Sequence, residues 1–122
     1  MSAVTFPEVF NLADYFLFDR LKEDMGGDTA LRFGDRTWTY AEVAERTEGV
    51  AALLRDAGLR HEERALIVLP DLPPFAWTFF GVLKAGGVIA MGNPDAPTGD
   101  LAYLLEYTRA SVLVTVPRVV TA

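Results

Sequence analysis

Three glutamates in the first half of the chain form its densest group of side chains that could do chemistry. Glu42, Glu45 and Glu48 recur at every third position, and paired carboxylates are common general acids and bases in enzymes. Residues three apart also lie side by side on a helix, where such a run forms a solvated outer face. We expect this second arrangement, and therefore no catalytic site at these glutamates.

The other candidate groups are isolated in the sequence. The single histidine, His61, lies in a charged connection, where we expect it to be solvated. Ser111 begins a β-branched run that predicts a strand core, so we expect it to lack the histidine partner that a nucleophilic serine needs. The sequence contains no cysteine, which excludes thiolate catalysis and cysteine-based zinc sites. We therefore predict no catalytic residue and no metal site in this chain.

One glycine pair could be mistaken for a phosphate-binding loop. Gly86 and Gly87 follow an apolar segment and precede a short apolar run. We expect them to end a helix, because glycine readily adopts the left-handed conformation found there. Phosphate-binding loops instead open a helix and continue into Lys and Ser or Thr.

The composition is typical of one small soluble domain. Of the 122 residues 51% are hydrophobic, enough for a core, and the formal charge is −6. An acidic chain with scattered basic residues is not typical of nucleic-acid binding. The N-terminus has no basic segment followed by a long apolar one, so no signal peptide is predicted. We expect a cytoplasmic protein without a membrane span.

The segment 64–94 organises the predicted fold. Its strands are the apolar runs Ala65–Leu69 and Val88–Met91, which are typical of parallel strands covered on both faces. Between them Phe75–Ala85 is apolar on nearly all sides, which is typical of a buried helix. Prolines before this helix end the first strand and start a turn. The succession predicts a right-handed βαβ unit.

The remaining segments predict an α/β domain around this unit. Asn11 is a suitable N-cap, Thr39 and Glu42 have the spacing of a capping box, and Gly34-Asp35 is typical of a hairpin turn. The expected elements are a helix over Leu12–Asp24, a hairpin of Thr29–Phe33 with Arg36–Thr39, helices over Tyr40–Ala57 and Gly99–Tyr107, and a third parallel strand over Ser111–Val116. The predicted fold class is α/β, with a mostly parallel sheet flanked by helices and a short N-terminal β-hairpin.

Several segments, in this order, resemble the N-terminal part of the adenylate-forming enzymes, which include acyl-CoA synthetases, aryl-CoA ligases and adenylation domains. They are TWTYAEVA at 37–44, the helix and strand of 50–67, PPFAWTFFGVLKAGG at 73–87, Asn93-Pro94, and the helix and strand of 101–114. The opening FNLADYF at 10–16 is similar to the start of benzoate-CoA ligases and other aryl-CoA ligases. The resemblance covers nearly the whole chain.

The resemblance implies a two-step reaction on an aromatic or other carboxylic acid. In the family, the acid and ATP, with Mg²⁺, form an acyl-adenylate and pyrophosphate, and coenzyme A then attacks to give the thioester. The family's ATP-binding loop and the catalytic lysine of its C-terminal lid have no counterpart in this sequence. We therefore expect residues 1–122 to be an incomplete N-terminal portion of the large N-terminal domain. Alone, this portion would be mainly structural, inactive and free of cofactors, with the remainder of the same enzyme as its partner.

The resemblance also implies that two loops lie near ligand. In the family, the loop after Asn-Pro borders the channel through which the CoA arm enters, which makes Asn93, Pro94 and Asp95 candidates. Some aryl-CoA ligases have a basic residue after this proline for a CoA phosphate, whereas Asp95 would repel that phosphate. Pro73 and Phe75, in the turn before the apolar helix, are candidates for the edge of the acyl or CoA channel.

Two other functions are compatible with the sequence. One is an adenylation domain that loads a carrier protein in peptide or polyketide biosynthesis and shares the first half-reaction. The other is a non-catalytic α/β interaction module that binds a partner through its Phe-rich N-terminal helix. Open strand edges after Val116, and an apolar helix over Phe75–Ala85 that needs further cover, favour an enzyme portion completed by more polypeptide.

Overall fold

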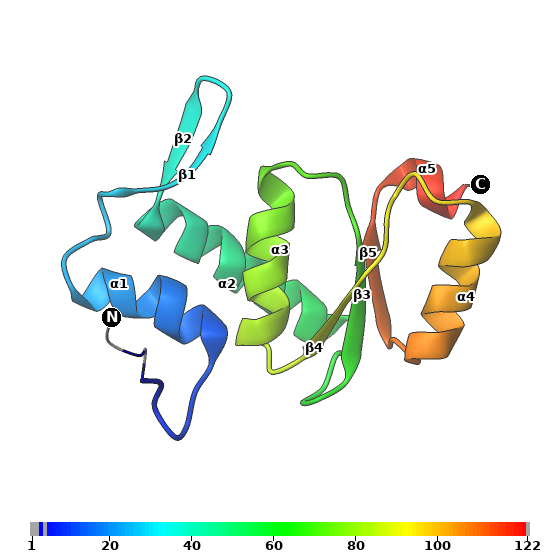
Figure 1. The fold of residues 1–122 in the computed structure, drawn as a ribbon, viewed down its shortest axis with the longest axis horizontal. Helices are drawn as coiled ribbons and strands as arrows, with labels where there is room; N and C mark the ends of the chain where they lie inside the picture. The colour runs from blue at the N-terminus through cyan, green and yellow to red at the C-terminus, as the bar shows by residue number, and fades with distance from the viewer. Residues whose placement is uncertain (1–2, 4, 122) are drawn as a thin grey trace.

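The chain forms a three-stranded parallel sheet with helices on both faces and a separate hairpin (Figure 1). The structure is a computed structural model, and it describes residue 3 and residues 5–121. In chain order the elements are η1 (Asp14–Phe18), α1 (Asp19–Lys22), β1 (Thr29–Phe33), β2 (Arg36–Thr39), α2 (Tyr40–Asp56), β3 (Arg64–Val68), α3 (Pro73–Lys84), β4 (Val88–Met91), α4 (Thr98–Thr108), β5 (Val112–Thr115) and α5 (Pro117–Val120). The predicted α/β class, parallel sheet and N-terminal hairpin are confirmed.

The central strand, β3, is fully buried along residues 65–68. Both neighbours run parallel to it, with Ala65 opposite Ile89 of β4 and Val112 of β5. Helices cover both faces of the strand, which explains why its sequence is an uninterrupted apolar run. Among the described residues β4 and β5 each pair with β3 alone, so each has an outer edge without a strand partner.

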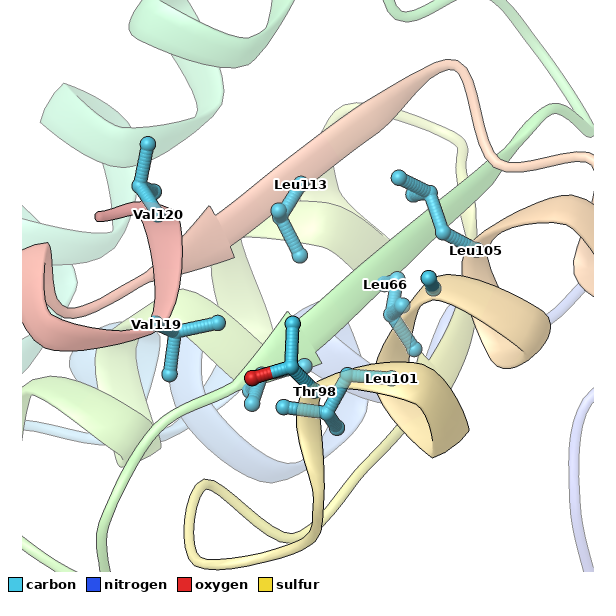
Figure 2. Close-up of a pocket in the computed structure, with 9 residues that line it drawn as sticks. Leu66, Thr98, Leu101, Leu105, Leu113, Val119 and Val120 are labelled. Carbon is cyan, nitrogen blue, oxygen red and sulfur yellow. The ribbon is translucent and has the colours of Figure 1, made fainter. Parts of the chain in front are cut away.

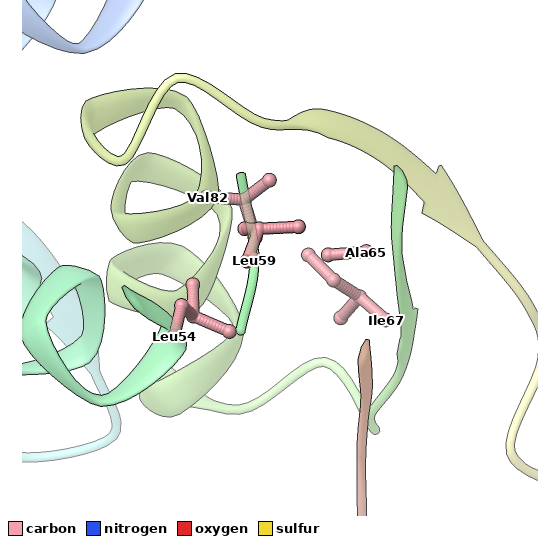
Figure 3. Packing of buried hydrophobic residues seen from close by; sticks show 5 residues of the cluster. All are labelled: Leu54, Leu59, Ala65, Ile67 and Val82. Atoms are coloured by element: carbon pink, nitrogen blue, oxygen red, sulfur yellow. The ribbon is translucent and has the colours of Figure 1, made fainter. Parts of the chain in front are cut away.

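The helices α2 and α3 cover one face of the sheet. Leu54 of α2, Val82 of α3 and Leu59 of the following connection meet Ala65 and Ile67 of β3 in one apolar cluster (Figure 3). These five residues are between 0% and 4% exposed. Burying one leucine, isoleucine or valine side chain contributes about 1.5–3 kcal/mol, so this cluster holds α2 and α3 against the strand.

The opposite face of β3 is covered by α4. Leu66 and Val68 alternate along the strand with the residues of the first cluster and pack on Leu101 of α4. Gly92, just after β4, permits this close packing. A Cβ at Gly92 would lie 3.2 Å from Leu104 Cδ1.

The start of α2 and the C-terminal ends of α2 and α3 agree with the prediction, whereas α3 begins at Pro73, two residues before the predicted start at Phe75. Thr39 Oγ1 accepts from the Glu42 N–H at 3.1 Å, and Glu42 Oε1 accepts from the Thr39 N–H at 3.0 Å, which completes the capping box. Gly58 and Gly86, with φ of 99° and 84°, follow the two helices in the left-handed conformation.

The N-terminal helix differs from the predicted span Leu12–Asp24. Asn11 caps it as expected, because its Oδ1 accepts two backbone N–H groups of the first turn. The helix then widens into the π-turn η1, in which the Asp19 N–H donates to the Asp14 carbonyl, and α1 ends at Lys22. Asp24, with φ of 60°, reverses the chain after that point.

The N-terminal helix is attached to the C-terminal end of α3. Asn11 Nδ2 donates to the Leu83 carbonyl at 2.8 Å, and Lys84 Nζ lies 2.7 Å from Asp14 Oδ1. Arg55 of α2 donates to the Lys84 carbonyl at 3.2 Å. Two of these interactions use backbone carbonyl groups in the last turn of α3, and the third is an ion pair, so three segments of the chain meet at this end of α3.

α3 is less enclosed than its apolar sequence predicts. Its buried residues are Pro73, Thr78, Gly81 and Val82, while other apolar side chains such as Phe79 remain partly exposed. This exposure agrees with the expectation that the helix needs cover from further polypeptide, because α2 and the sheet enclose only part of its surface. In the part of the chain that the structure describes, no helix is long and apolar enough to cross a membrane.

α2 and α3 approach each other closely at Gly81. A Cβ at this position would lie 2.6 Å from Val50 Cγ1 and 3.3 Å from the Thr47 carbonyl oxygen. Because interiors are close-packed, no room remains there for a methyl group. Glycine at this position therefore sets the distance between α2 and α3, and with it the position of α3 over β3.

We expect Gly81→Ala to lower the free energy of opening of α3 by about 1–3 kcal/mol, because the methyl group overpacks the contact with Val50. Hydrogen exchange of the α3 amides in the full polypeptide measures this loss, as exchange faster by about fivefold or more. Gly49→Ala is the matched control, since a Cβ there meets nothing within 4 Å. This variant should slow hydrogen exchange in α2, because alanine stabilises a helix by about 0.5–1 kcal/mol relative to glycine. Equal protection of α3 in Gly81→Ala and the parent would contradict the role of Gly81.

Candidate functional site

The three glutamates of α2 do not form a site. Glu42, Glu45 and Glu48 are all exposed, as the sequence predicts for an outer helix face. The bonds between Glu42 and Thr39 lower the pKa of the Glu42 carboxyl group, first through the Thr39 backbone N–H and then through its hydroxyl. A carboxyl group with a lowered pKa stays ionised near neutral pH and is poorly suited to donate a proton.

His61 and Ser111 are also separate from any site. His61 is exposed, with its Nε2 3.7 Å from Glu62 Oε1. Ser111 is exposed as well, and its hydroxyl donates to Glu63 Oε2 at 3.2 Å. Its placement in a strand core is wrong, because β5 begins one residue later at Val112. Among the described residues, no group of three His, Asp or Glu side chains could hold a metal ion.

A cleft lies at the carboxyl ends of β3 and β4, and we call it the strand-end cleft. It has a volume of about 450 Å³ and is enclosed by the segment after β3, the start of α3 and the loop after β4. Its lining residues are Leu69, Pro70, Asp71, Phe75, Met91, Gly92, Asn93, Pro94 and Asp95. Ligands of α/β proteins bind outside the carboxyl ends of parallel strands, which makes this cleft the candidate site.

Four of the five residues predicted to border a ligand channel line this cleft. Phe75 lies in the first turn of α3, and residues 93–95 form the opposing loop. Pro73 is not among them, because it is buried and borders a different groove with Trp38 and Trp77. The structure therefore brings the two predicted loops together, with Pro73 as the exception.

Asn93 shapes the loop after β4. Its Oδ1 accepts from the Asp95 N–H at 2.9 Å, and its carbonyl accepts from the Ala96 N–H at 3.0 Å. The first bond is the side-chain turn that asparagine commonly forms. The Gly92 N–H donates to the Ile67 carbonyl at 2.9 Å, which extends the pairing with β3. These bonds fix the Asn-Pro edge of the cleft.

Arg118 of α5 contacts the same loop, and the sequence did not predict it. Its Nη1 lies 3.0 Å from Asp95 Oδ1 and donates to the Pro94 carbonyl at 3.4 Å. The Arg118 and Asp95 side chains are 57% and 77% exposed, so solvent and salt screen this ion pair. Pro117 at the first position of α5 is a helix-start signal, but a helix of four residues has no periodicity that would reveal which way Arg118 faces.

The lining of the cleft does not fit a nucleotide phosphate. It contains two carboxylates, Asp71 and Asp95, and no basic side chain. Arg118 partly neutralises Asp95 from outside the cleft. Phe75 and Met91 supply apolar surface, so the cleft is suited to an uncharged, partly apolar ligand group.

A second hollow, between the sheet and α4, offers no chemistry (Figure 2). It measures about 200 Å³, and its lining comes from β3, β5, α4 and α5. Thr98 carries the one polar side chain among its lining residues; the others are apolar, such as Leu66, Leu101 and Leu113. This hollow is a packing gap beside the core, and the strand-end cleft remains the candidate site.

Comparison with known proteins agrees with this architecture. Residues 18–122 match the family described as AMP-binding enzyme. Tyrocidine synthase 2 of Brevibacillus parabrevis is 31% identical over 99 residues, and a long-chain-fatty-acid–CoA ligase of Bacillus subtilis is 31% identical over 96 residues. The crystal structure of a benzoate CoA ligase from Burkholderia xenovorans superposes with a TM-score of 0.82 and 33% identity.

The aligned parts cover most of this chain but a small share of each relative. The alignment with the synthase covers 81% of this chain and 3% of the synthase. The alignment with the fatty-acid ligase covers 72% of this chain and 17% of that ligase, and the alignment with the benzoate ligase covers 93% of this chain and 23% of that ligase. The family match extends over most of the chain and the fold agrees with the benzoate ligase throughout the aligned part. The chain therefore belongs to the AMP-binding enzyme family, the adenylate-forming superfamily, and corresponds to the N-terminal part of these enzymes.

Proposed function

We propose that this chain is the N-terminal portion of an ATP-dependent aryl- or acyl-CoA ligase. The ligase would activate a carboxylic acid, benzoate or a similar aromatic acid, as its acyl-adenylate and transfer the acyl group to coenzyme A. The observation that carries the proposal is the 33% identity to a benzoate CoA ligase over 93% of the chain, with a TM-score of 0.82. A cytoplasmic location follows from the proposal, because ATP and coenzyme A are cytoplasmic substrates.

In this proposal residues 1–122 are an incomplete portion of the large N-terminal domain, and the rest of the enzyme is their partner. The open edges of β4 and β5 and the partly exposed face of α3 support this. The complete enzyme would use ATP, Mg²⁺ and coenzyme A. The lining of the strand-end cleft does not fit the phosphates of ATP, so the cleft contributes no step with the nucleotide.

The strand-end cleft is proposed to border the channel for the CoA arm. Its apolar lining at Phe75 and Met91 suits the uncharged part of that arm. Asp95 would repel a CoA phosphate, and the Arg118 guanidinium beside it offsets part of that repulsion. Asn93 and Pro94 act by holding the loop in place.

A carrier-protein-loading adenylation domain is the second candidate. The 31% identity to tyrocidine synthase 2 supports it, because this value is close to the identity with the CoA ligases. Both candidates share the formation of an acyl-adenylate. They differ in the thiol that accepts the acyl group.

The first test is activity of the full polypeptide. We expect pyrophosphate release that depends on ATP and on benzoate, anthranilate or a fatty acid, followed by thioester formation when coenzyme A is added. Pyrophosphate release without a CoA thioester, but with acylation of a phosphopantetheinyl carrier protein, would favour the adenylation domain. No turnover with any carboxylate would contradict both enzymes and favour a non-catalytic interaction module.

The second test concerns Asp95. Asp95→Asn should lower the KM for coenzyme A by about two- to fivefold at low salt, because it removes one repulsive charge near the CoA phosphates. The KM for the carboxylic acid in the same variant serves as the internal comparison. Asp100→Asn is the charge-matched control, because Asp100 is an exposed residue of α4 and lies outside the lining of the cleft. An equal KM for coenzyme A in Asp95→Asn and the parent would refute the placement of the channel.

The third test concerns residues 1–122 expressed alone. We expect them to aggregate or to melt without cooperativity, because strand edges and apolar helix surface remain uncovered. Size-exclusion chromatography and a thermal melt measure this. A monodisperse monomer with a cooperative transition would show that this portion needs no partner.

A further inference from the structure

A groove on the hairpin side of the molecule has a charge opposite to that of the whole chain. It is the groove that Pro73 borders, about 340 Å³ in volume, and we call it the Arg–Trp groove. Its other lining residues are Phe33, Arg36, Trp38, Arg46, Pro74 and Trp77. They come from the hairpin, from α2 and from the start of α3. In Figure 1 this region lies on the other side of α3 from the parallel sheet.

Two arginines in this groove are positioned by two tryptophans. The Trp38 and Trp77 rings meet edge to face with their centroids 6.0 Å apart. The Arg36 guanidinium lies 4.7 Å from the Trp38 ring centroid, and the Arg46 guanidinium lies 5.4 Å from that of Trp77. These cation–π contacts restrict the arginine side chains, so less conformational entropy is lost when they bind a carboxylate.

The groove has two positive charges that form no salt bridge within the described part of the chain. Among the described residues, neither Arg36 nor Arg46 has a carboxylate oxygen within 4.0 Å. Glu42 and Glu45 line the neighbouring hollow beside Arg46; besides its bonds to Thr39, the Glu42 carboxylate has its pKa lowered by Arg36 and Arg46, so it offsets part of their charge. The lining of the groove itself holds two positive charges and no negative one, in a chain of net charge −6.

We propose that the Arg–Trp groove binds an acidic segment of a separate polypeptide. Carboxylates of that segment would pair with Arg36 and Arg46, and an apolar side chain would pack on Trp77. Tryptophan and arginine are the residues most enriched in the energetic centres of protein interfaces. Guanidinium groups bind carboxylates with two parallel hydrogen bonds, which gives specificity as well as affinity.

Other occupants fit the groove less well. Trp38 is 5% exposed, so it has no free ring face on which a nucleic-acid base could stack. The open edges of β4 and β5, where further strands of the same enzyme would add, lie on the far side of α3. This separation favours a second polypeptide over strands that extend the sheet.

The test uses the full polypeptide labelled with 5-fluorotryptophan, because Trp38 and Trp77 both lie in the groove and report on it directly. Their ¹⁹F resonances are assigned with Trp38→Phe and Trp77→Phe. Poly-L-glutamate is the acidic probe, and sodium sulfate at equal charge concentration is the comparison. We expect a saturable shift of the Trp77 resonance with poly-L-glutamate, and an apparent Kd at least about tenfold weaker in Arg36→Gln/Arg46→Gln.

Control variants keep the test specific. Arg60→Gln/Arg109→Gln removes the same charge at exposed positions outside the groove lining and should bind like the parent. An unchanged far-UV circular dichroism spectrum and melting temperature of the free Arg36→Gln/Arg46→Gln variant will show that the fold is intact. If that variant is misfolded, Arg36→Lys/Arg46→Lys replaces it and should bind with intermediate affinity.

Four outcomes would overturn the proposal. The first is that poly-L-glutamate causes no saturable shift of the Trp77 resonance, and the second is that Arg36→Gln/Arg46→Gln shows the same shift as the parent. The third is that sulfate causes the same response as poly-L-glutamate. The fourth is that the Trp77 resonance of the free polypeptide shows no solvent isotope shift. The last would mean that the rest of the enzyme already fills the groove. Because none of these readouts uses ligase activity, they are independent of the proposed reaction.

Discussion

The burial of β3 between two parallel neighbours and two helical layers determines where every other element lies. Its residues alternate between the cluster under α2 and α3 and the cluster under α4, so one strand connects both halves of the core. The contact at Gly81 then fixes how closely α2 and α3 stack over that strand. The strand-end cleft forms where β3 and β4 stop and the chain turns away toward α3 and the loop after β4.

Local sequence signals predicted most of this fold and part of the candidate site. Apolar runs identified β3 and β4, the Thr39–Glu42 spacing identified the start of α2, and Asn93-Pro94 identified the loop that borders the cleft. These signals were sufficient because each depends on a few neighbouring residues and on backbone preferences that hold in any fold.

Sequence patterns did not predict the features that depend on contacts between distant segments. The π-turn at η1, the ion pair between Asp95 and Arg118 and the pairing of Trp38 with Trp77 each need a three-dimensional arrangement. The exposure of α3 is a related case, because apolar composition predicts how much cover a helix needs, and the rest of the chain decides how much it receives. Pro73 shows the same limit: Asp71 and Phe75 border the cleft, while Pro73 between them borders the groove with the tryptophans.

The bonds at the C-terminal end of α3 have a mechanical consequence. The N-terminal helix holds this end through Asn11 and Asp14, and α2 holds it through Arg55, while the body of α3 is packed against β3. α3 therefore cannot slide along the sheet without breaking contacts with three other segments. The strand-end cleft therefore has a fixed wall on this side, because Phe75 in the first turn of α3 lines it.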